Sequence, residues 1–302
     1  MLLTSPLPID VAPLLAGHEL RGGDRRLSRP EMLEAVAEVE GLICLLSDRI
    51  DEELLARAPA LRVVSNFAVG VDNIDFAAVA RHGVAVTNTP DVLTDATADL
   101  AFALMLAVAR RVVEGDALAR TGGWRGWAPD QFLGTDVSGR TLGIVGMGRI
   151  GRAVARRAAG FGMRVIHTGR GGEGMALDPL LSEADFVSLH APLTDETRGM
   201  IGARELALMK PTAFLINTAR GALVDETALA EALEVGRIAG AGLDVYIAEP
   251  TIPEALRRQP RAVLLPHVGS ATAQTRARMA ELCATGVREV LAGRRPANLV
   301  PR

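Results

Sequence analysis

Three polar residues stand at the ends of apolar runs in the second half of the chain and could together perform acid–base chemistry. Arg220 follows the run AFLIN in NTARG, Glu249 ends LDVYIAE, and His267 ends AVLLPH. A protonated imidazole can give a proton to a carbonyl oxygen, while a carboxylate on its other nitrogen fixes the tautomer. A guanidinium binds a carboxylate in a planar fork. We therefore interpret the three as candidates for acting on a 2-keto acid; the alternatives are an ion pair for Arg220, a solvated turn for Glu249 and a hydrogen-bonded strand end for His267.

A glycine-rich turn lies upstream of these residues. Gly146-Met147-Gly148-Arg149-Ile150-Gly151 directly follows the strand-like run TLGIV and opens the helical stretch RIGRAVARRAAGFG. In such a motif the first glycine permits a tight turn, the second lets a pyrophosphate approach the backbone, and the third lets helix and strand pack closely. A turn without ligand is the alternative, but the flanking strand and helix favour dinucleotide binding.

The position that selects the cofactor's ribose carries no acid. An NAD-binding unit usually shows Asp or Glu about twenty residues beyond the turn, at the end of the next strand. Here the sequence reads His167-Thr168-Gly169-Arg170, and the nearest carboxylate is Glu173. We expect Arg170 and Thr168 to bind a 2′-phosphate and NADP(H) to be preferred, with NAD(H) as the other cofactor considered. The alternative for Arg170 is a solvated surface side chain.

Composition excludes several function classes. The 302 residues, with 33 basic and 36 acidic side chains, suffice for two domain cores and show no basic patch for nucleic acid or an anionic membrane. Lys210 is the only lysine and Tyr246 the only tyrosine, which rules out a reductase that uses a Tyr-x-x-x-Lys pair. Cys44 and Cys283 lie far apart, so we expect buried thiols in a reducing compartment. No metal site is predicted, since the histidines lack ligand spacing.

No targeting segment is recognised at the N-terminus. The stretch MLLTSPLPIDVAPLLAG has no basic residue before Arg21, and prolines interrupt it. The longest apolar run, Ala98 to Ala109, is shorter than the roughly 20 residues of a membrane span. We therefore expect a cytoplasmic protein that does not enter membranes.

Short apolar runs alternate with amphipathic stretches almost throughout, which predicts an α/β fold. Strand candidates in the first third are LLTS, 41–47, 61–69 and 84–89, and a second series follows as TLGIVG, MRVIHT, DFVSLHA, AFLINTA, GAGLDV and AVLLPH. A long helix over about Thr94 to Leu118 is expected between the two series. A final helix over about Thr272 to Ala292 could return the chain to the first lobe.

Six ordered motifs between about residues 40 and 295 together resemble the D-isomer-specific 2-hydroxyacid dehydrogenase family. They are VSNFAVGVDNID, GIVGMGRIG, SLHAPLTDETRGMI, LINTARGALVDE, AGLDVYIAEP and LLPHVGSAT. GGWRGW and HTGR further resemble its glyoxylate and hydroxypyruvate reductase branch. The resemblance implies two lobes: a Rossmann NADP-binding domain (96–274) inserted in a flavodoxin-like α/β substrate-binding, catalytic domain (1–95 and 275–302).

The resemblance also assigns site residues. Arg220, Glu249 and His267 would be catalytic, and the amides of Val69 and Gly70 would hold the substrate carboxylate with Arg220 and His267 beside it. Leu46 and Ser47 could line the same pocket. Cofactor contacts are implied for the glycine turn 146–151 and for Thr97, Thr168, Gly169, Arg170, His190, Pro192, Thr197, Thr218, Ala219, Arg220, Asp244, His267 and Gly269. Asp244 would accept a hydrogen bond from the nicotinamide carboxamide, and His190 is the rival of His267 as the acid.

The resemblance implies NADPH-dependent reduction of glyoxylate or hydroxypyruvate to glycolate or D-glycerate, with hydride from the nicotinamide and the proton from His267. Two alternatives stay open: an NAD-dependent D-2-hydroxyacid dehydrogenase of another substrate such as 3-phosphoglycerate, and a non-catalytic dinucleotide-sensing module. A homodimer joined through the NADP-binding domain is also implied. Trp124 and Trp127 would then form part of the dimer contact or reach the partner's pocket, the alternative being that they pack against the long helix.

Overall fold

The computed structural model describes residues 1–301, which fold into two compact units. Of these residues, unit 1 comprises 1–93 and those from 270 onward, and unit 2 comprises 94–269. The predicted boundaries lie at 95/96 and 274/275. The division falls earlier at both places because α4 begins at Thr94 and because Thr272 caps α11 (Ala273–Leu291), which packs on the sheet of unit 1.

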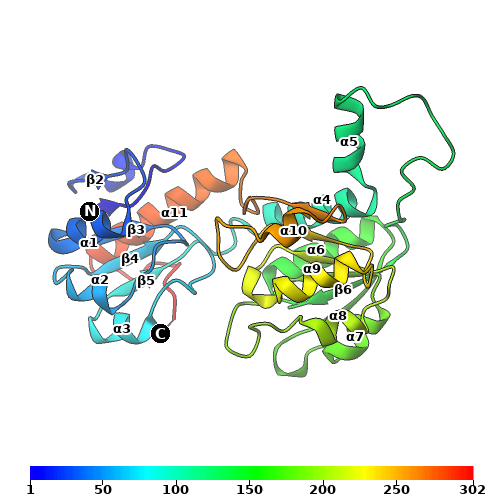
Figure 1. The fold of residues 1–302 in the computed structure, drawn as a ribbon. Helices are drawn as coiled ribbons and strands as arrows, with labels where there is room; N and C mark the ends of the chain where they lie inside the picture. Colours follow the sequence, from blue (N-terminus) through cyan, green and yellow to red (C-terminus); the bar gives the residue numbers. More distant parts are fainter. Residues whose placement is uncertain (302) are drawn as a thin grey trace. The chain divides into compact units, whose positions relative to one another are not determined.

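Unit 1 is a five-stranded parallel sheet with helices on both faces (Figure 1). Its strand order, β2-β1-β3-β4-β5, is that of flavodoxin-like sheets. The strands are β1 (Leu2–Leu3), β2 (Arg21–Gly22), β3 (Gly41–Cys44), β4 (Val63–Asn66) and β5 (Ala85–Thr87). β2 was not predicted from the sequence, because its two exposed residues carry no apolar pattern.

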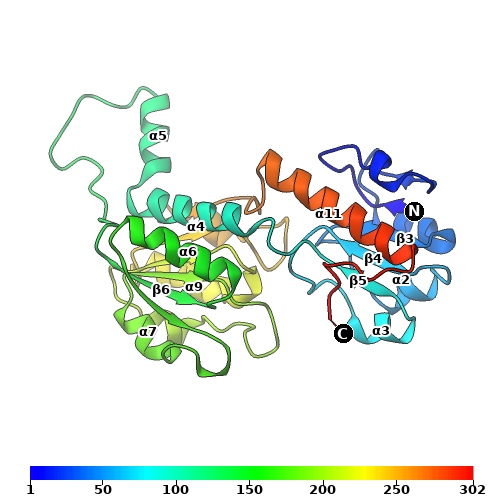
Figure 2. The same cartoon turned by 180° about the vertical axis from the view of Figure 1, so that it is seen from behind.

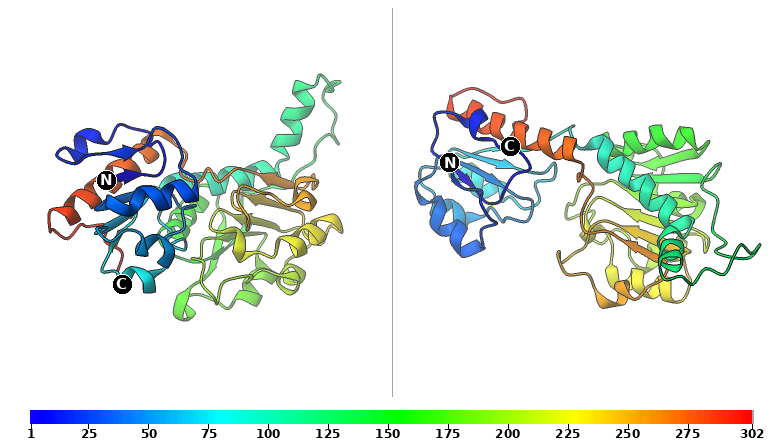
Figure 3. Two further views of the ribbon diagram at one scale, coloured as in Figure 1. Left: turned by 60° about the vertical axis from the view of Figure 1, so that its left-hand side comes forward. Right: turned by 90° about the horizontal axis from the view of Figure 1, so that it is seen from above.

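The helices of unit 1 begin where side chains satisfy their first amides. In α1 (Arg29–Ala35), Ser28 and Glu31 form a capping box. Asp51 caps α2 (Glu52–Ala56) and Asp75 caps α3 (Phe76–Arg81). These three helices and the 3₁₀ turn η2 (Val36–Glu38) bury one apolar face of the sheet. α11 and η1 (Ala12–Leu15) cover the other, as both views of Figure 3 show for α11.

Unit 2 is a six-stranded parallel sheet in the order β11-β10-β9-β8-β6-β7. The order reverses between β6 and β8, and ligands of such sheets bind at this switch point, beyond the carboxyl ends of the strands. All six strands of the second predicted series are present. They are β6 (Thr141–Val145), β7 (Arg164–Thr168), β8 (Phe186–Leu189), β9 (Phe214–Asn217), β10 (Gly240–Leu243) and β11 (Ala262–Leu264).

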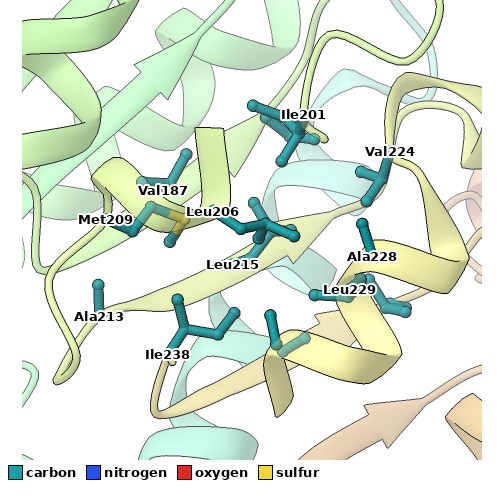
Figure 4. Close-up of a cluster of buried hydrophobic side chains, with 14 of the residues drawn as sticks. Val187, Ile201, Leu206, Met209, Ala213, Leu215, Val224, Ala228, Leu229 and Ile238 are labelled. Carbon is teal, nitrogen blue, oxygen red and sulfur yellow. The ribbon is translucent and has the colours of Figure 1, made fainter. Parts of the chain in front are cut away.

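Helices cover both faces of this second sheet. α4 (Thr94–Ala109) and α6 (Arg149–Gly160) enclose one apolar cluster. α7 (Leu177–Glu183), α8 (Ala203–Leu208) and α9 (Glu226–Glu234) enclose the other, part of which Figure 4 shows around Leu215 and Leu229. The 3₁₀ turns η3 (Arg170–Gly172) and η4 (Gly221–Leu223) and the short helix α10 (Glu254–Arg257) lie in the connections beyond β7, β9 and β10.

The single long helix predicted over Thr94 to Leu118 is wrong. The chain leaves the helical conformation at Arg111, whose φ is 55°, and continues as a separate helix, α5 (Val112–Arg120). α5 buries none of its residues and, with the loop that follows, projects away from the remainder of unit 2 (Figure 2). The sequence pattern concealed this break because Val112 and Val113 continue the apolar run although both are about half exposed.

Candidate active site

The three candidate catalytic residues follow three neighbouring strands of unit 2. Arg220 comes after β9, Glu249 after β10 and His267 after β11. These strands are adjacent and parallel, so their carboxyl ends lie along one edge of the sheet. The fold thus brings to one edge three residues that lie far apart in sequence.

Glu249 and His267 form a hydrogen-bonded pair. His267 Nδ1 lies 2.7 Å from Glu249 Oε2, and the Tyr246 amide donates to Glu249 Oε1 at 3.0 Å. Burial of the Glu249 carboxyl group opposes its charge, but these two hydrogen bonds and the positive charge of Arg220 hold its pKa below the usual value. A carboxylate on Nδ1 fixes the imidazole orientation, which leaves Nε2 to act on a substrate.

The backbone around His267 is held in an unusual conformation. The φ angle of His267 is 53°, in the left-handed region that non-glycine residues seldom adopt. Asp244 stabilises it: its backbone carbonyl accepts from the His267 amide, and its carboxylate oxygens accept from the amides of Val268 (2.7 Å) and Gly269 (2.8 Å). Burial raises the pKa of Asp244 against these bonds. Asp244 therefore positions His267, a role that sequence reasoning had not given it.

A tight turn presents Arg220. Asn217, the last residue of β9, accepts a hydrogen bond from the Ala219 amide and donates one to the Arg220 carbonyl. The guanidinium Nη1 donates to the Ala219 carbonyl at 2.7 Å. The turn is closed from the other side, since a Cβ on Gly221 would lie only 2.0 Å from the Tyr246 carbonyl carbon. Arg220 is thus held against the segment that carries Glu249.

The glycine turn after β6 has the geometry that its sequence predicts. Gly146 has a φ of 100°, and a Cβ there would lie 2.6 Å from the Ala191 amide nitrogen. A Cβ on Gly151 would lie 2.1 Å from the Gly146 carbonyl oxygen. Gly148, by contrast, adjoins open space, and the α6 N-terminus that follows has no side-chain cap and no acidic residue in its first turn. The uncapped amides of α6 therefore face a space that a side chain at position 148 would occupy, and this arrangement suits a pyrophosphate.

The ribose position is more closed than the sequence suggested. The chain folds back after β7, where the Gly169 amide donates to the Glu173 carbonyl and Thr168 bridges to Gly174. Glu173 therefore lies beside Gly169, and its carboxylate pairs with Arg152 at 3.1 Å. Arg170 is exposed, and within residues 1–301 no carboxylate pairs with it. Neither Glu173 nor Arg152 was singled out as a site residue, because only the fold-back places them there.

Other predicted cofactor residues of unit 2 lie along the same sheet edge. The Thr218 hydroxyl is buried and has no hydrogen-bond partner within residues 1–301, which suits a group that binds a ligand. Thr97 at the start of α4 donates to the Gly269 carbonyl at 3.3 Å. The Thr197 hydroxyl is engaged inside its own loop, where it donates to the Pro192 carbonyl at 2.7 Å.

His190, the rival of His267, has a different environment. It follows β8, and its Nε2 lies 2.8 Å from the Ser188 hydroxyl; no carboxylate of residues 1–301 bonds either ring nitrogen. Burial lowers the pKa of His190 to about 4, so its imidazole is neutral near pH 7. A neutral imidazole is a poor proton donor, and this favours His267 over His190 as the acid.

In unit 1 the predicted substrate loop follows β4. Asn66 ends the strand and donates to the Gly70 carbonyl, and Asn88 donates to the Val69 carbonyl. Ser47, in the neighbouring loop after β3, accepts a hydrogen bond from Arg26 at 2.7 Å. Asp75 caps α3, so its role is structural.

Several features outside these sites bear on the excluded functions. Cys44 and Cys283 are free thiols. Burial raises the pKa of both, that of Cys283 to about 12. In residues 1–301, no three His, Cys, Asp or Glu side chains gather as metal ligands would. None of the helices described has the length and apolarity that crossing a bilayer demands.

The two tryptophans lie in the projecting loop after α5. Trp124 is 57% exposed and Trp127 is 83% exposed. Leu133, farther along the loop, is 68% exposed. The alternative in which the tryptophans pack against the long helix is therefore wrong.

Comparison with known proteins gives one consistent result. Residues 102–269 match the family model described as D-isomer specific 2-hydroxyacid dehydrogenase, NAD binding domain. A glyoxylate reductase of Thermococcus litoralis is 53% identical over 286 residues, which cover 90% of this chain and 86% of the relative. A glyoxylate reductase of Pyrococcus furiosus is 50% identical over 291 residues, covering 92% and 87%.

Solved structures agree. A protein of Thermus thermophilus superposes with a TM-score of 0.95 at 49% identity and covers 99% of each chain. An NADPH-dependent glyoxylate/hydroxypyruvate reductase from Sinorhizobium meliloti, in complex with NADP and malonate, has a TM-score of 0.86 at 34% identity, covering 99% of this chain and 96% of that one. The glycine turn, the uncapped α6 N-terminus and the unpartnered Thr218 hydroxyl fit a nicotinamide dinucleotide in unit 2.

Proposed function

The chain belongs to the D-isomer specific 2-hydroxyacid dehydrogenase family, and from that premise we propose that it reduces small 2-keto acids, glyoxylate or hydroxypyruvate, to glycolate or D-glycerate. The observation that carries this proposal is the His267–Glu249 pair at 2.7 Å on the sheet edge that also holds Arg220. Relatives named glyoxylate reductase support the substrate class.

His267 supplies the proton in this mechanism. Its Nδ1 is bonded to Glu249, so Nε2 gives its proton to the carbonyl oxygen of the keto acid. The carboxylate of Glu249 stabilises the imidazolium before that transfer. A bound nicotinamide dinucleotide supplies the hydride that the carbonyl carbon receives. In the reverse direction neutral His267 would take the proton from the hydroxyl group.

Arg220 and backbone amides orient the substrate. A guanidinium binds a carboxylate in a planar fork, so Arg220 suits the acid group of a 2-keto acid. In unit 1, amides of the loop after β4, those of Val69 and Gly70 among them, bind a carboxylate in our proposal. A sensor that only bound the dinucleotide would not need the Glu249–His267 pair, and this favours the enzyme over the binding module.

We propose a preference for NADP(H) over NAD(H). Arg170 is exposed at the end of β7 and pairs with no carboxylate in residues 1–301, so it can bind a 2′-phosphate. Glu173 lies beside Gly169 and is neutralised by Arg152, which limits its repulsion of that phosphate. The relative from Sinorhizobium meliloti was solved with NADP.

The reaction is tested by following the absorbance at 340 nm with glyoxylate, hydroxypyruvate and 3-phosphohydroxypyruvate, each with NADPH and with NADH. We expect glyoxylate and hydroxypyruvate to be reduced and His267→Ala to lose most turnover while cofactor affinity is kept. Reduction of the phosphorylated acid alone would replace the proposal by the 3-phosphoglycerate alternative. Tight cofactor binding without any turnover would favour the sensor.

Cofactor preference is tested with Arg170→Asp. Loss of a charge-assisted hydrogen bond should lower the ratio of kcat/KM for NADPH over NADH by at least about tenfold. Arg257→Asp in α10 makes the same charge change on an exposed arginine elsewhere in unit 2 and should leave the ratio unchanged. An unaltered ratio in Arg170→Asp would contradict the assignment.

We also propose that the projecting segment of unit 2 joins two copies of the chain. Its exposed apolar side chains, Val112, Val113, Trp124, Trp127 and Leu133, are of the kind that a subunit contact covers. Light scattering during gel filtration should report a dimer for the wild type and a monomer for Trp127→Glu. A monomeric wild type would refute this assembly.

A further inference from the structure

Three successive carbonyl groups of the loop after β4 are held by hydrogen bonds. The Thr89 amide donates to the Ala68 carbonyl at 2.9 Å, and Asn88 Nδ2 donates to the Val69 carbonyl at 2.8 Å. Asn66 Nδ2 donates to the Gly70 carbonyl at 2.7 Å. In each of these three peptide groups the hydrogen bond to the carbonyl oxygen therefore fixes the orientation of the peptide plane.

The fixed carbonyls determine where the amides of the loop point. The only cis peptide in residues 1–301 joins Glu249 to Pro250, so the peptides of this loop are trans. In a trans peptide the N–H points opposite to the C=O. The amides of Val69, Gly70 and Val71 are thus directed away from the donors, and within unit 1 none of them donates a hydrogen bond. Oriented and unpaired backbone amides bind anions.

The two asparagine side chains are themselves held from several directions. Asn66 is fully buried, and its amide nitrogen also lies 3.2 Å from Asn73 Oδ1. Asn73 in turn donates to the carbonyls of Leu45 and Asp48 in the loop after β3. On the other side Asn298, 4% exposed, donates to the Asn88 carbonyl at 2.8 Å, and its own carbonyl accepts from the Asn88 amide.

These contacts connect three adjacent strand ends and the C-terminal segment. β3, β4 and β5 are neighbours, and their carboxyl ends contribute Leu45, Asn66 and Asn88, of which Asn66 is the last residue of its strand. The C-terminal segment is fixed to β5, since Thr87 bridges to Leu299 and the Val300 amide donates to the Val86 carbonyl. This network restricts the conformations of the loop before any ligand binds. Less conformational entropy is therefore lost when a ligand binds.

From this geometry we propose that Asn66 and Asn88 are positioning residues, which hold the amides of Gly70 and Val71 ready to bind the carboxylate of the substrate. The inference rests on the proposed function and deepens it, because it names the side chains that make the loop an anion site. Asn298 acts one step further away by holding Asn88. Neither asparagine needs to touch the substrate.

The test separates binding from turnover. Asn88→Ala should raise KM for glyoxylate at least about tenfold, the loss expected when an oriented amide no longer meets a carboxylate. Its kcat should change by less than about threefold, since His267 and Glu249 are untouched. If Asn88→Ala impairs folding, Asn88→Val, which fills the site with a side chain that cannot donate a hydrogen bond, should give the same rise in KM. A merely structural role would lower the melting temperature and leave KM unchanged, and that result would overturn the proposal.

A matched control removes a bond of the same type elsewhere in unit 1. Arg288 donates to the Leu14 carbonyl at 3.3 Å, so Arg288→Ala deletes a side-chain bond to a backbone carbonyl away from the loop. We expect KM and kcat of Arg288→Ala to equal those of the wild type. An equal rise in KM in this control would attribute the effect to general loosening of unit 1 and would refute the role of Asn88.

Oxalate binding to the full chain saturated with cofactor supplies a readout without turnover. Oxalate should shift the amide resonances of Gly70 and Val71 in the wild type, and its affinity should fall at least about tenfold in Asn88→Ala. If the wild type reduces no 2-keto acid but these shifts and this loss occur, the proposed function fails and the positioning role stands. Unshifted Gly70 and Val71 resonances, or unchanged oxalate affinity in Asn88→Ala, would overturn the positioning role whatever the turnover.

Discussion

Replacing Glu249 by Gln should impair turnover through His267 alone. The Tyr246 amide donates to Glu249 Oε1, so the glutamine oxygen is retained at that position and its NH₂ group faces His267 Nδ1. An NH₂ donor opposite Nδ1 can bond only an unprotonated nitrogen. The imidazolium would then lose both its hydrogen-bond acceptor and its negative partner, and the form of His267 that gives a proton would be disfavoured.

The magnitude follows from the bond that is lost. A hydrogen bond to a charged group contributes about 1.5–3 kcal/mol, which corresponds to about a 10- to 160-fold fall in kcat/KM. Glu249 is partly buried and its pKa is lowered by the His267 bond and by the charge of Arg220, so solvent screens this pair less than a surface ion pair. We therefore expect the loss in kcat rather than in cofactor affinity.

Steady-state rates at 340 nm and cofactor fluorescence titration measure the two quantities. The control is Glu254→Gln in α10, which removes a carboxylate from an exposed pair with Arg258 and should leave kcat/KM unchanged. If Glu249→Gln keeps its kcat/KM within about threefold of the wild type, the carboxylate does not support His267 and the acid–base assignment is wrong.

The remaining predictions concern the cofactor unit. Gly148→Val should weaken NADPH binding at least about tenfold and leave the melting temperature unchanged, because a Cβ on Gly148 meets only open space. Gly151→Ala should instead lower the melting temperature, because its Cβ would lie 2.1 Å from the Gly146 carbonyl oxygen. Undiminished NADPH affinity in Gly148→Val would mean that the pyrophosphate lies elsewhere. The pKa of His190 is lowered from 6.5 to about 4 in the folded chain. Between these two pH values the unfolded chain therefore binds a proton at His190 that the folded chain does not bind. Stability is therefore full above about pH 6.5 and falls by up to about 3 kcal/mol as the pH drops toward 4. Urea unfolding across this range should show the fall in the wild type and a smaller one in His190→Gln; equal slopes would refute the buried neutral histidine.

The local pattern carried much of the fold. All six strands of unit 2 follow from short apolar runs in the sequence, and β3, β4 and β5 from similar runs in unit 1. The glycine turn follows from its three glycines, because two of them stand where no Cβ fits and the third stands beside open space. Arg220, Glu249 and His267 could be named because the carboxyl ends of parallel strands meet at one edge.

Local pattern failed where neighbours were distant in sequence or where exposure decided the structure. The break at Arg111 depends on a single left-handed residue, and the apolar side chains after it are exposed, so the pattern predicted one continuous helix. Glu173 reached the ribose position only because the chain folds back after β7. No spacing rule indicates such a reversal.

The sequence by itself determined the fold class, the glycine turn and the identities of the three residues that could perform the chemistry, since each of these depends on residue types within a few positions of one another. Only the tertiary structure decided that Asp244 holds the backbone of His267 and that Asn88 and Asn298 lock the loop after β4. Asn298 bonds a carbonyl 210 residues away. Hydrogen bonds of this kind are set by how strands and termini come together in space, and that information lies in no segment of the chain taken alone.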